Sequence, residues 1–173
     1  MEARNSRSEE SIMIEGLERL TIFEGLTRDQ LHTVGERCEI TTVKRGETVF
    51  RAGEPAQYLL FVRSGRVELR FQVMYAGTPN ECALDIITAD GACGWSAMIP
   101  PHKYTLTACA VEDSELLRIR QTDLQHCCDA DPRMGFVVMG NIARTVGQRY
   151  ELARQSLVRE IQNNLKLRDP LAG

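Results

Sequence analysis

Residues 94–107 combine side chains suited to holding an anion. Ser96 and Thr107 supply hydroxyl groups, and His102 and Lys103 lie close enough in sequence to supply positive charge. Hydroxyls donate one hydrogen bond each, and an ammonium group donates up to three. This stretch therefore favours binding of a small anionic group.

Catalysis has little support among the residue types that usually perform it. The segment Gly94–Ala97 lacks the second glycine of the Gly-x-Ser-x-Gly nucleophile motif. The three histidines, His32, His102 and His126, never lie two residues apart, so the spacing predicts no metal site. We expect no catalytic residue, no metal and no cofactor, and the chain is predicted not to be an enzyme.

The spacing of the cysteines includes no Cys-x-x-Cys pair and no zinc-finger pattern. The six cysteines are Cys38, Cys82, Cys93, Cys109, Cys127 and Cys128. The adjacent pair Cys127-Cys128 would point about 100° apart on a helix, so the two thiols would not face each other. We expect reduced, apolar side chains, with thiol-based redox sensing through Cys127-Cys128 or Cys93 as an alternative.

Length and composition limit the class of protein. The chain has 173 residues, of which 43% are hydrophobic and 26% charged, with a formal net charge of −3. This size fits one domain with an appendage, and the acidic balance argues against a general nucleic-acid-binding surface. No apolar run approaches the roughly 20 residues that span a bilayer, and the N-terminus has no signal-peptide core. We expect a cytoplasmic protein without a membrane segment.

Helical periodicity appears first at the N-terminus. Apolar residues at helix-compatible spacing predict a helix over Glu9–Leu20. Thr27 and Gln30 have the spacing of a capping box, which predicts a second helix from Arg28 to Gly35.

From Cys38 the apolar period changes to two. Short segments separated by glycine-containing or acidic turns predict strands at Ile40–Val43, Thr48–Phe50, Tyr58–Val62, Val67–Tyr75, Ala83–Ile87, Thr105–Val111 and Glu115–Ile119. Many short strands at near-regular spacing are typical of an antiparallel sandwich or jelly roll. The predicted fold is mainly β, a double-stranded β-helix (jelly roll) with N-terminal helices and a long C-terminal helix.

Helical periodicity returns after Ile119. Thr122 is predicted to cap a short helix through Cys128, and Asp131 followed by Pro132 begins a longer one. That helix carries one apolar stripe, made of Met139, Ile142, Val146, Tyr150, Ala153, Leu157, Ile161 and Leu165.

The stripe is longer than one flank of a small barrel, which favours a homodimer through residues 139–165 over a helix folded wholly onto its own domain. The predicted segments are 1–20 (N-terminal helical), 21–130 (β-roll) and 131–173 (dimerisation helix and tail).

The order of these elements resembles the cyclic-nucleotide-binding domain, the sensor half of catabolite-activator-type regulators. The resemblance covers about Leu20 to Tyr150 and is carried by the phrases Phe23–Thr27, Gly46–Phe50, Ala52–Pro55, Leu60–Val67, Leu116–Ile119 and Asp131-Pro132. In that family a Gly-Glu pair opens a short helix, whose amides and dipole favour the phosphate, and the Glu accepts from the ribose hydroxyl. A later Arg, in a phrase like Arg-Ala-Ala-Thr, holds the phosphate oxygens.

Two of these positions depart from the family. Gly94 matches the glycine and Thr107 the threonine, but Trp95 stands where the glutamate should be and Tyr104 where the arginine should be. Each lost charge-assisted contact is worth about 2 kcal/mol, so losing both weakens binding about a thousandfold. We therefore expect weak binding of cyclic AMP and cyclic GMP.

The candidate ligand-binding residues are Gly94, Trp95, Ser96, Ala97, Met98, Tyr104, Thr105 and Thr107. Trp95 can stack on a ring of the ligand or, alternatively, fill the vacated cavity as core. The predicted function is a ligand-sensing module that binds a small anionic or atypical nucleotide-like ligand and moves its C-terminal helix about residues 129–131.

The alternative function is a binding-incompetent scaffold that dimerises or docks on a protein partner. Only Lys166 to Gly173 follow the stripe, so we expect no winged helix and no direct DNA binding.

Overall fold

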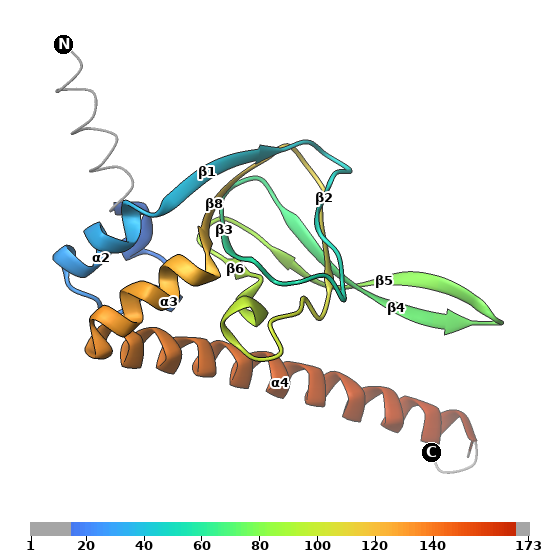
Figure 1. The fold of residues 1–173 in the computed structure, drawn as a ribbon. Helices are drawn as coiled ribbons and strands as arrows, with labels where there is room; N and C mark the ends of the chain where they lie inside the picture. The colour runs from blue at the N-terminus through green and yellow to red at the C-terminus, as the bar shows by residue number, and fades with distance from the viewer. Residues whose placement is uncertain (1–14, 169–173) are drawn as a thin grey trace.

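The computed structural model describes residues 15–168. Its elements are η1 (Thr21–Phe23), α2 (Arg28–Gly35), β1 (Cys38–Val43), β2 (Thr48–Phe50), β3 (Tyr58–Ser64), β4 (Val67–Tyr75), β5 (Thr78–Ile87), β6 (Ala92–Cys93), η2 (Trp95–Met98), β7 (Thr107–Ala110), β8 (Ser114–Arg120), α3 (Gln121–Ala130) and α4 (Pro132–Arg168). Figure 1 shows the strands as a roll, with α2 and α3 at one end and α4 passing along it.

The N-terminal helices agree in part with their predictions. Residues 15–18 are helical, so the helix predicted over Glu9–Leu20 ends before Leu20, and its residues 9–14 lie outside the described part. The capping box of α2 is confirmed, since the Gln30 amide donates to the Thr27 hydroxyl and the Thr27 amide donates to the Gln30 side chain. This reciprocal pair satisfies two backbone donors that the helix itself cannot.

The strands form two four-stranded antiparallel sheets, in the orders β1-β8-β3-β6 and β2-β7-β4-β5. The predicted mainly β jelly roll with a long C-terminal helix is confirmed. Each predicted strand is present, but β5 begins at Thr78 rather than Ala83, and β7 begins at Thr107 rather than Thr105. The two-residue β6 was not predicted because two residues are too few to show a period.

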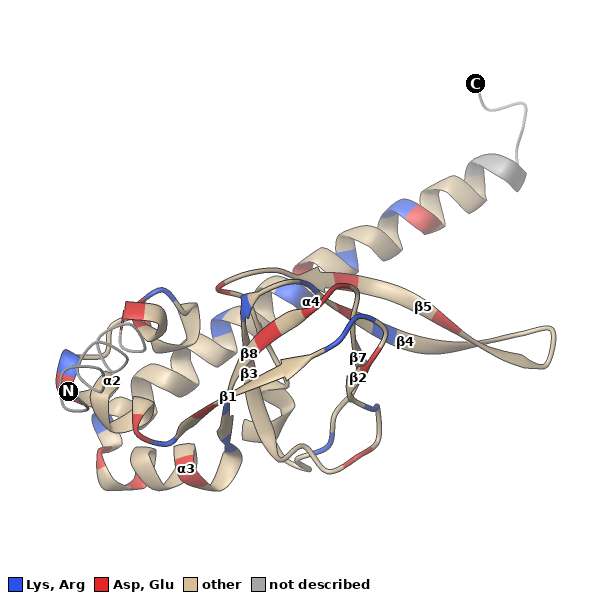
Figure 2. Cartoon of the chain, turned by 90° about the horizontal axis from the view of Figure 1, so that it is seen from above, with Lys and Arg blue, Asp and Glu red and all other residues tan. Residues whose placement is uncertain are grey.

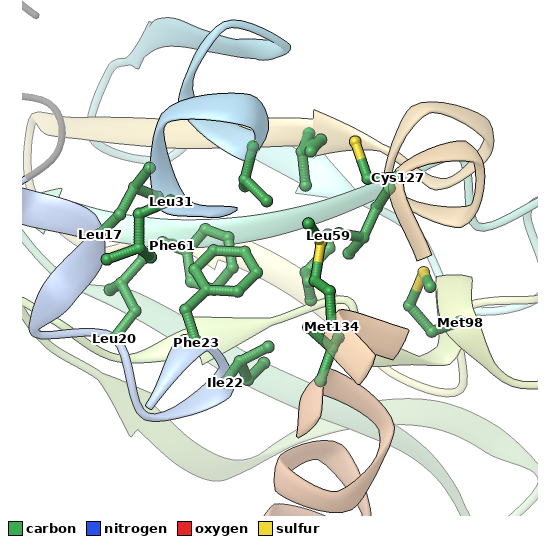
Figure 3. Packing of buried hydrophobic residues seen from close by; sticks show 14 of the residues in the cluster. Leu17, Leu20, Ile22, Phe23, Leu31, Leu59, Phe61, Met98, Cys127 and Met134 are labelled. Carbon is green, nitrogen blue, oxygen red and sulfur yellow. The ribbon is translucent and has the colours of Figure 1, made fainter. Parts of the chain in front are cut away.

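Strand β3 separates two hydrophobic cores. Its residues 59–62 are all buried, and alternate side chains point to opposite faces of the sheet. Leu60 and Val62 belong to the core inside the roll, while Leu59 and Phe61 belong to the core beneath the helices. In the second core the ring of Phe61 lies 5.2 Å from that of Phe23, with Leu17, Leu20, Ile22 and Met134 around them (Figure 3).

The two C-terminal helices are joined at Asp131. Its carboxylate accepts from the amides of Arg133 and Met134, which confirms the predicted start of α4. The predicted cap of α3 by Thr122 is wrong: α3 begins at Gln121, with Arg120 at the N-cap position and no side-chain cap. The chain leaves β8 directly into the helix there, so no loop precedes α3 in which Thr122 could act as a cap.

Charged residues of both signs are interspersed over the roll and the helices (Figure 2). Several pair across strands, such as Arg63 with Glu115 at 2.7 Å and Arg118 with Glu39 at 2.9 Å. Such part-exposed pairs contribute little stability individually. No helix among residues 15–168 is long and apolar enough to cross a membrane.

Asn141 ties α4 to the N-terminal segment. It is 5% exposed, and its side-chain amide donates to the carbonyls of Ile22 at 3.0 Å and Glu24 at 2.8 Å. These carbonyls belong to the irregular chain around η1, so Asn141 takes the place of a backbone partner. The contact fixes where the first half of α4 lies.

Replacing Asn141 by Leu should lower the free energy of unfolding by about 2–4 kcal/mol, because two buried carbonyls lose their donor. Urea denaturation at fixed protein concentration measures the loss. The matched control is Asn164→Leu on the exposed part of the same helix, which should change stability by at most about 0.5 kcal/mol. Equal effects of the two substitutions would show that Asn141 does not anchor α4.

Candidate functional site

The segment between β6 and β7 contains the predicted cassette. It begins at Gly94, whose φ of +75° lies in the left-handed region, and continues as η2. A Cβ on Gly94 would lie 2.7 Å from the Tyr58 carbonyl oxygen and 3.0 Å from the Leu60 side chain. Both the backbone angle and the close approach to β3 therefore require glycine here.

Tyr104 is built into the fold. Its side chain is buried, and its ring stacks on Phe50 with centroids 3.9 Å apart and planes 12° apart. Its hydroxyl donates to the Tyr58 carbonyl at 3.0 Å and accepts from the Tyr58 amide at 3.1 Å. Burial, the largest cause, raises the pKa of Tyr104 above its ordinary value of 10.0. The phenol is therefore neutral, and its hydroxyl is already hydrogen-bonded to the Tyr58 amide and carbonyl.

Beside Tyr104 the cassette encloses a hollow of only about 20 Å³. It is lined by Phe50, Leu69, Gly94, Trp95, Ser96, Thr105, Leu106 and Arg149. A volume of that order holds about one water molecule, whereas pockets for drug-sized ligands measure roughly 300 Å³ or more. The half-buried Trp95 also packs against the core beneath the helices. In this structure the cassette is closed.

The structure gathers four of the eight candidate residues around the hollow, namely Gly94, Trp95, Ser96 and Thr105. The others lie elsewhere. Ala97 is part of the core inside the roll, as is Tyr104, while Met98 is part of the core beneath the helices. The Thr107 hydroxyl accepts from the Ala52 amide at 3.2 Å, outside the lining of the hollow.

Arg149, which comes from α4, lines the hollow although it was not among the candidates. Its guanidinium donates to the Ala92 carbonyl at 3.2 Å and lies 3.7 Å from the Asp85 carboxylate. It is the only charged residue of the lining. The helical period could have located it, because it follows the buried Ile142 by seven residues and so lies on the same face.

No group of three or more His, Cys, Asp or Glu in the described part of the chain is arranged to hold a metal ion. The cysteines are free thiols, and four of them are buried. Burial raises the pKa of Cys38 and Cys93 to about 12 and that of Cys128 to about 11. Because the thiolate is the reactive form, these three groups are poorly suited to redox chemistry.

Among curated proteins, the chain is 28% identical over 134 residues to Glutaminase 1 from Bradyrhizobium diazoefficiens. The match covers 76% of this chain and 20% of that protein, so the chain spans about a fifth of the relative's length.

Several solved structures share the fold. A cyclic nucleotide-binding protein from Geobacter metallireducens is 25% identical, with a TM-score of 0.67 over 79% of this chain and 96% of that one. The Thermus thermophilus catabolite activator protein is 24% identical, with a TM-score of 0.65 over 79% and 61%. The regulatory subunit of a cAMP-independent protein kinase A from Trypanosoma brucei, in a mutant bound to cAMP, is 16% identical, with a TM-score of 0.72 over 88% and 53%. The last two likenesses concern the fold alone.

The cyclic nucleotide-binding domain family model matches residues 40–131, more than half of the 173 residues. This range extends from β1 to the start of α4 and includes the whole cassette. The chain therefore belongs to the cyclic nucleotide-binding domain family and has the fold of its regulatory domains.

Proposed function

We propose that this chain is a non-enzymatic regulatory module that assembles through α4 and does not depend on a cyclic nucleotide. The observation that carries the proposal is Tyr104, which stands at the position of the family's phosphate-binding arginine and closes the cassette. Its ring and hydroxyl are held by Phe50 and the Tyr58 main chain. The fold also occurs in a regulatory subunit described as cAMP-independent, so the fold does not by itself require cAMP.

Two separate effects lower the affinity of the cassette for cyclic nucleotides. Opening the cassette would break both hydrogen bonds of the Tyr104 hydroxyl and its stack on Phe50, at a total of about 3 kcal/mol. That reduces apparent affinity about a hundredfold. An opened cassette would still lack the carboxylate and the guanidinium that Trp95 and Tyr104 replace. The two effects together place cyclic nucleotides beyond millimolar affinity.

Assembly through α4 is supported by a second apolar face. Met134, Val138 and Ile142 face the domain core and are at most 2% exposed. The other face leaves large apolar side chains in solvent: Phe136, Met139, Tyr150, Leu157, Ile161 and Leu165. Residues 152–165 are all exposed. Because short helices without tertiary packing are marginal in water, this half of α4 needs a partner to be stable.

Two glycines on α4 point to the same conclusion. Gly140 and Gly147 have no atom within 4 Å of an added Cβ, unlike Gly135, which lies against Cys128. Each glycine lowers helix stability by about 1 kcal/mol relative to alanine without any packing benefit in one chain. Ala143 lies between them on the same face, so the three positions form a flat surface where a second α4 can approach closely. We infer a homodimer through residues 139–165.

The chain is also proposed to act in the cytoplasm and to bind a protein partner. The six free thiols fit a reducing compartment, which supports action in the cytoplasm. The exposed apolar residues of α4 would also suit docking on a protein partner, so the homodimer can form part of a larger assembly.

A second candidate function is sensing of a small anion at the cassette. It is favoured by Ser96 and Arg149, which bring a hydroxyl and a guanidinium to the same hollow. Binding would have to open the hollow and draw Arg149 away from Ala92, which would shift α4 about residues 129–131. A ligand can drive that shift only if it binds the opened state more tightly.

Calorimetric titration of the purified chain tests the first proposal. Cyclic AMP and cyclic GMP should give no saturable heat up to about 1 mM. The double variant Trp95→Glu and Tyr104→Arg should gain about 100,000-fold in affinity, because it restores two charge-assisted contacts, worth about a thousandfold, and removes the Tyr104 contacts that close the cassette, worth about a hundredfold. The control, Trp95→Gln with Tyr104→Leu, removes the rings without adding charge and should gain at most about a hundredfold, from loss of the contacts that close the cassette.

Micromolar binding by the unaltered chain would refute nucleotide independence. Saturable heat from another anionic metabolite would instead support the second candidate, provided that Arg149→Gln abolishes it.

Sedimentation analysis tests the assembly. The unaltered chain should sediment as a species of twice the 19.5 kDa of one chain. Ile161→Asp places a charge in the exposed apolar face and should weaken dimerisation by about a hundredfold or more, since burying an unpaired carboxylate is costly. Ser156→Asp, on another face of the same helix segment, is the matched control and should leave the dimer intact. The dimer would be ruled out if the unaltered chain still sedimented as a monomer at 100 times the protein concentration used for the variants.

A further inference from the structure

A second cavity, of about 100 Å³, lies between the two sheets and is distinct from the cassette hollow. It is lined by Thr41, Val43, Thr48, Val49, Tyr58, Leu60, Tyr104, Leu116 and Arg118. Tyr104 is buried in the core inside the roll and stacks on Phe50, which lines the cassette hollow. The cavity therefore lies behind the residue that closes the cassette, and it shares none of the cassette's own residues 94–98.

The wall of this cavity is apolar at its base and polar toward its rim. Leu60, Leu116 and Tyr104 are at most 6% exposed and form an apolar base. Thr41 and Thr48 are only partly buried and bring two hydroxyls to the lining. Neither hydroxyl has a hydrogen-bond partner among residues 15–168. Both are free to bond a guest.

Arg118 is the only charged residue of the lining. Its guanidinium lies 4.5 Å from the centroid of the Tyr58 ring, a cation–π contact that keeps it beside the cavity. Nε and Nη2 both donate to one oxygen of Glu39, at 3.0 and 2.9 Å, so Nη1 is left for another acceptor. Arg120 lies on the same ring, 5.1 Å from its centroid. The two guanidinium groups and the Glu39 carboxylate give the surroundings of the Tyr58 ring a net positive charge, although of the three only Arg118 lines the cavity.

We propose that this cavity binds a short-chain monocarboxylate. The hydrocarbon tail would lie on Leu60 and Leu116, and the carboxylate would accept from Arg118 and the threonine hydroxyls. A cavity of about 150 Å³ holds the six carbons of benzene, so one of about 100 Å³ holds roughly four non-hydrogen atoms, which is the carbon chain of a short carboxylate with its oxygens at the open rim. The proposal goes beyond the assembly function and does not require the cassette to open.

Sodium butyrate is the probe, since it has a suitable size and one negative charge. Titration of the full chain, followed by two-dimensional ¹H–¹⁵N NMR, should give saturable shifts of the amides of Thr41, Thr48 and Tyr104. The dissociation constant should be on the order of 1 mM, because so few atoms limit affinity. n-Butylamine, of similar size and opposite charge, should give no saturable shifts. No saturation with butyrate, or an equal response to the amine, would overturn the proposal.

Variants identify the site. Thr41→Phe fills the cavity and should abolish the shifts, whereas Thr42→Phe, the next residue of β1 and on its opposite face, should leave them unchanged. Arg118→Gln should weaken binding about tenfold, and this variant decides the matter if Thr41→Phe does not fold. Shifts that persist in these variants but vanish in Ser96→Trp would place the anion in the cassette and refute the site proposed here.

Discussion

Two hydrogen bonds between the Tyr104 hydroxyl and the Tyr58 main chain determine the form of the cassette. Strand β6 ends at Cys93, after pairing with Leu60 and Phe61, so on the side of β3 away from β8 the Tyr58 amide and carbonyl have no strand beside them. The Tyr104 hydroxyl satisfies both the amide and the carbonyl. Gly94 must then pass close to β3 and to the Tyr104 ring. The Tyr104 contact that closes the cassette therefore also supplies hydrogen-bond partners to the edge of the sheet. Opening the cassette would leave the Tyr58 amide and carbonyl unpaired.

The long helix α4 packs on the roll along its first half and exposes an apolar surface along its second half. Its first half is held by Asn141 on the N-terminal segment and by Arg149 on β6. Its second half leaves the roll and exposes apolar side chains as far as Leu165. Because the anchored half fixes the direction of the exposed half, the domain presents that apolar face in one orientation. An exposed apolar face of this length is the surface on which the proposed homodimer rests.

Much of the fold could be predicted from the sequence, because it depends on local periodicity. The capping box at Thr27, the start of α4 at Asp131 and the strand pattern follow from rules that act over a few residues. The closed cassette could be suspected from Trp95 and Tyr104, but the partner of the Tyr104 hydroxyl could not be identified. That partner is Tyr58, 46 residues away, and the contact depends on where the short β6 ends. Arg149 differs, since the helical period places it on the face of the buried Ile142, although only the packing of α4 shows that this face reaches the hollow.

A ligand regulates a domain only by shifting it between two arrangements that it binds unequally. In this chain, side chains already hold the arrangement in which α4 lies along the roll: Asn141 fixes its first half, and Arg149 joins it to the strand that leads into the cassette. The ring of Tyr104 is buried at the cassette, and its hydroxyl makes two hydrogen bonds with the Tyr58 main chain. Arg149, the one charged residue that lines the hollow, already joins the helix to the Ala92 carbonyl. On the function proposed above, the roll would orient the exposed face of α4, and regulation would act on what binds that face.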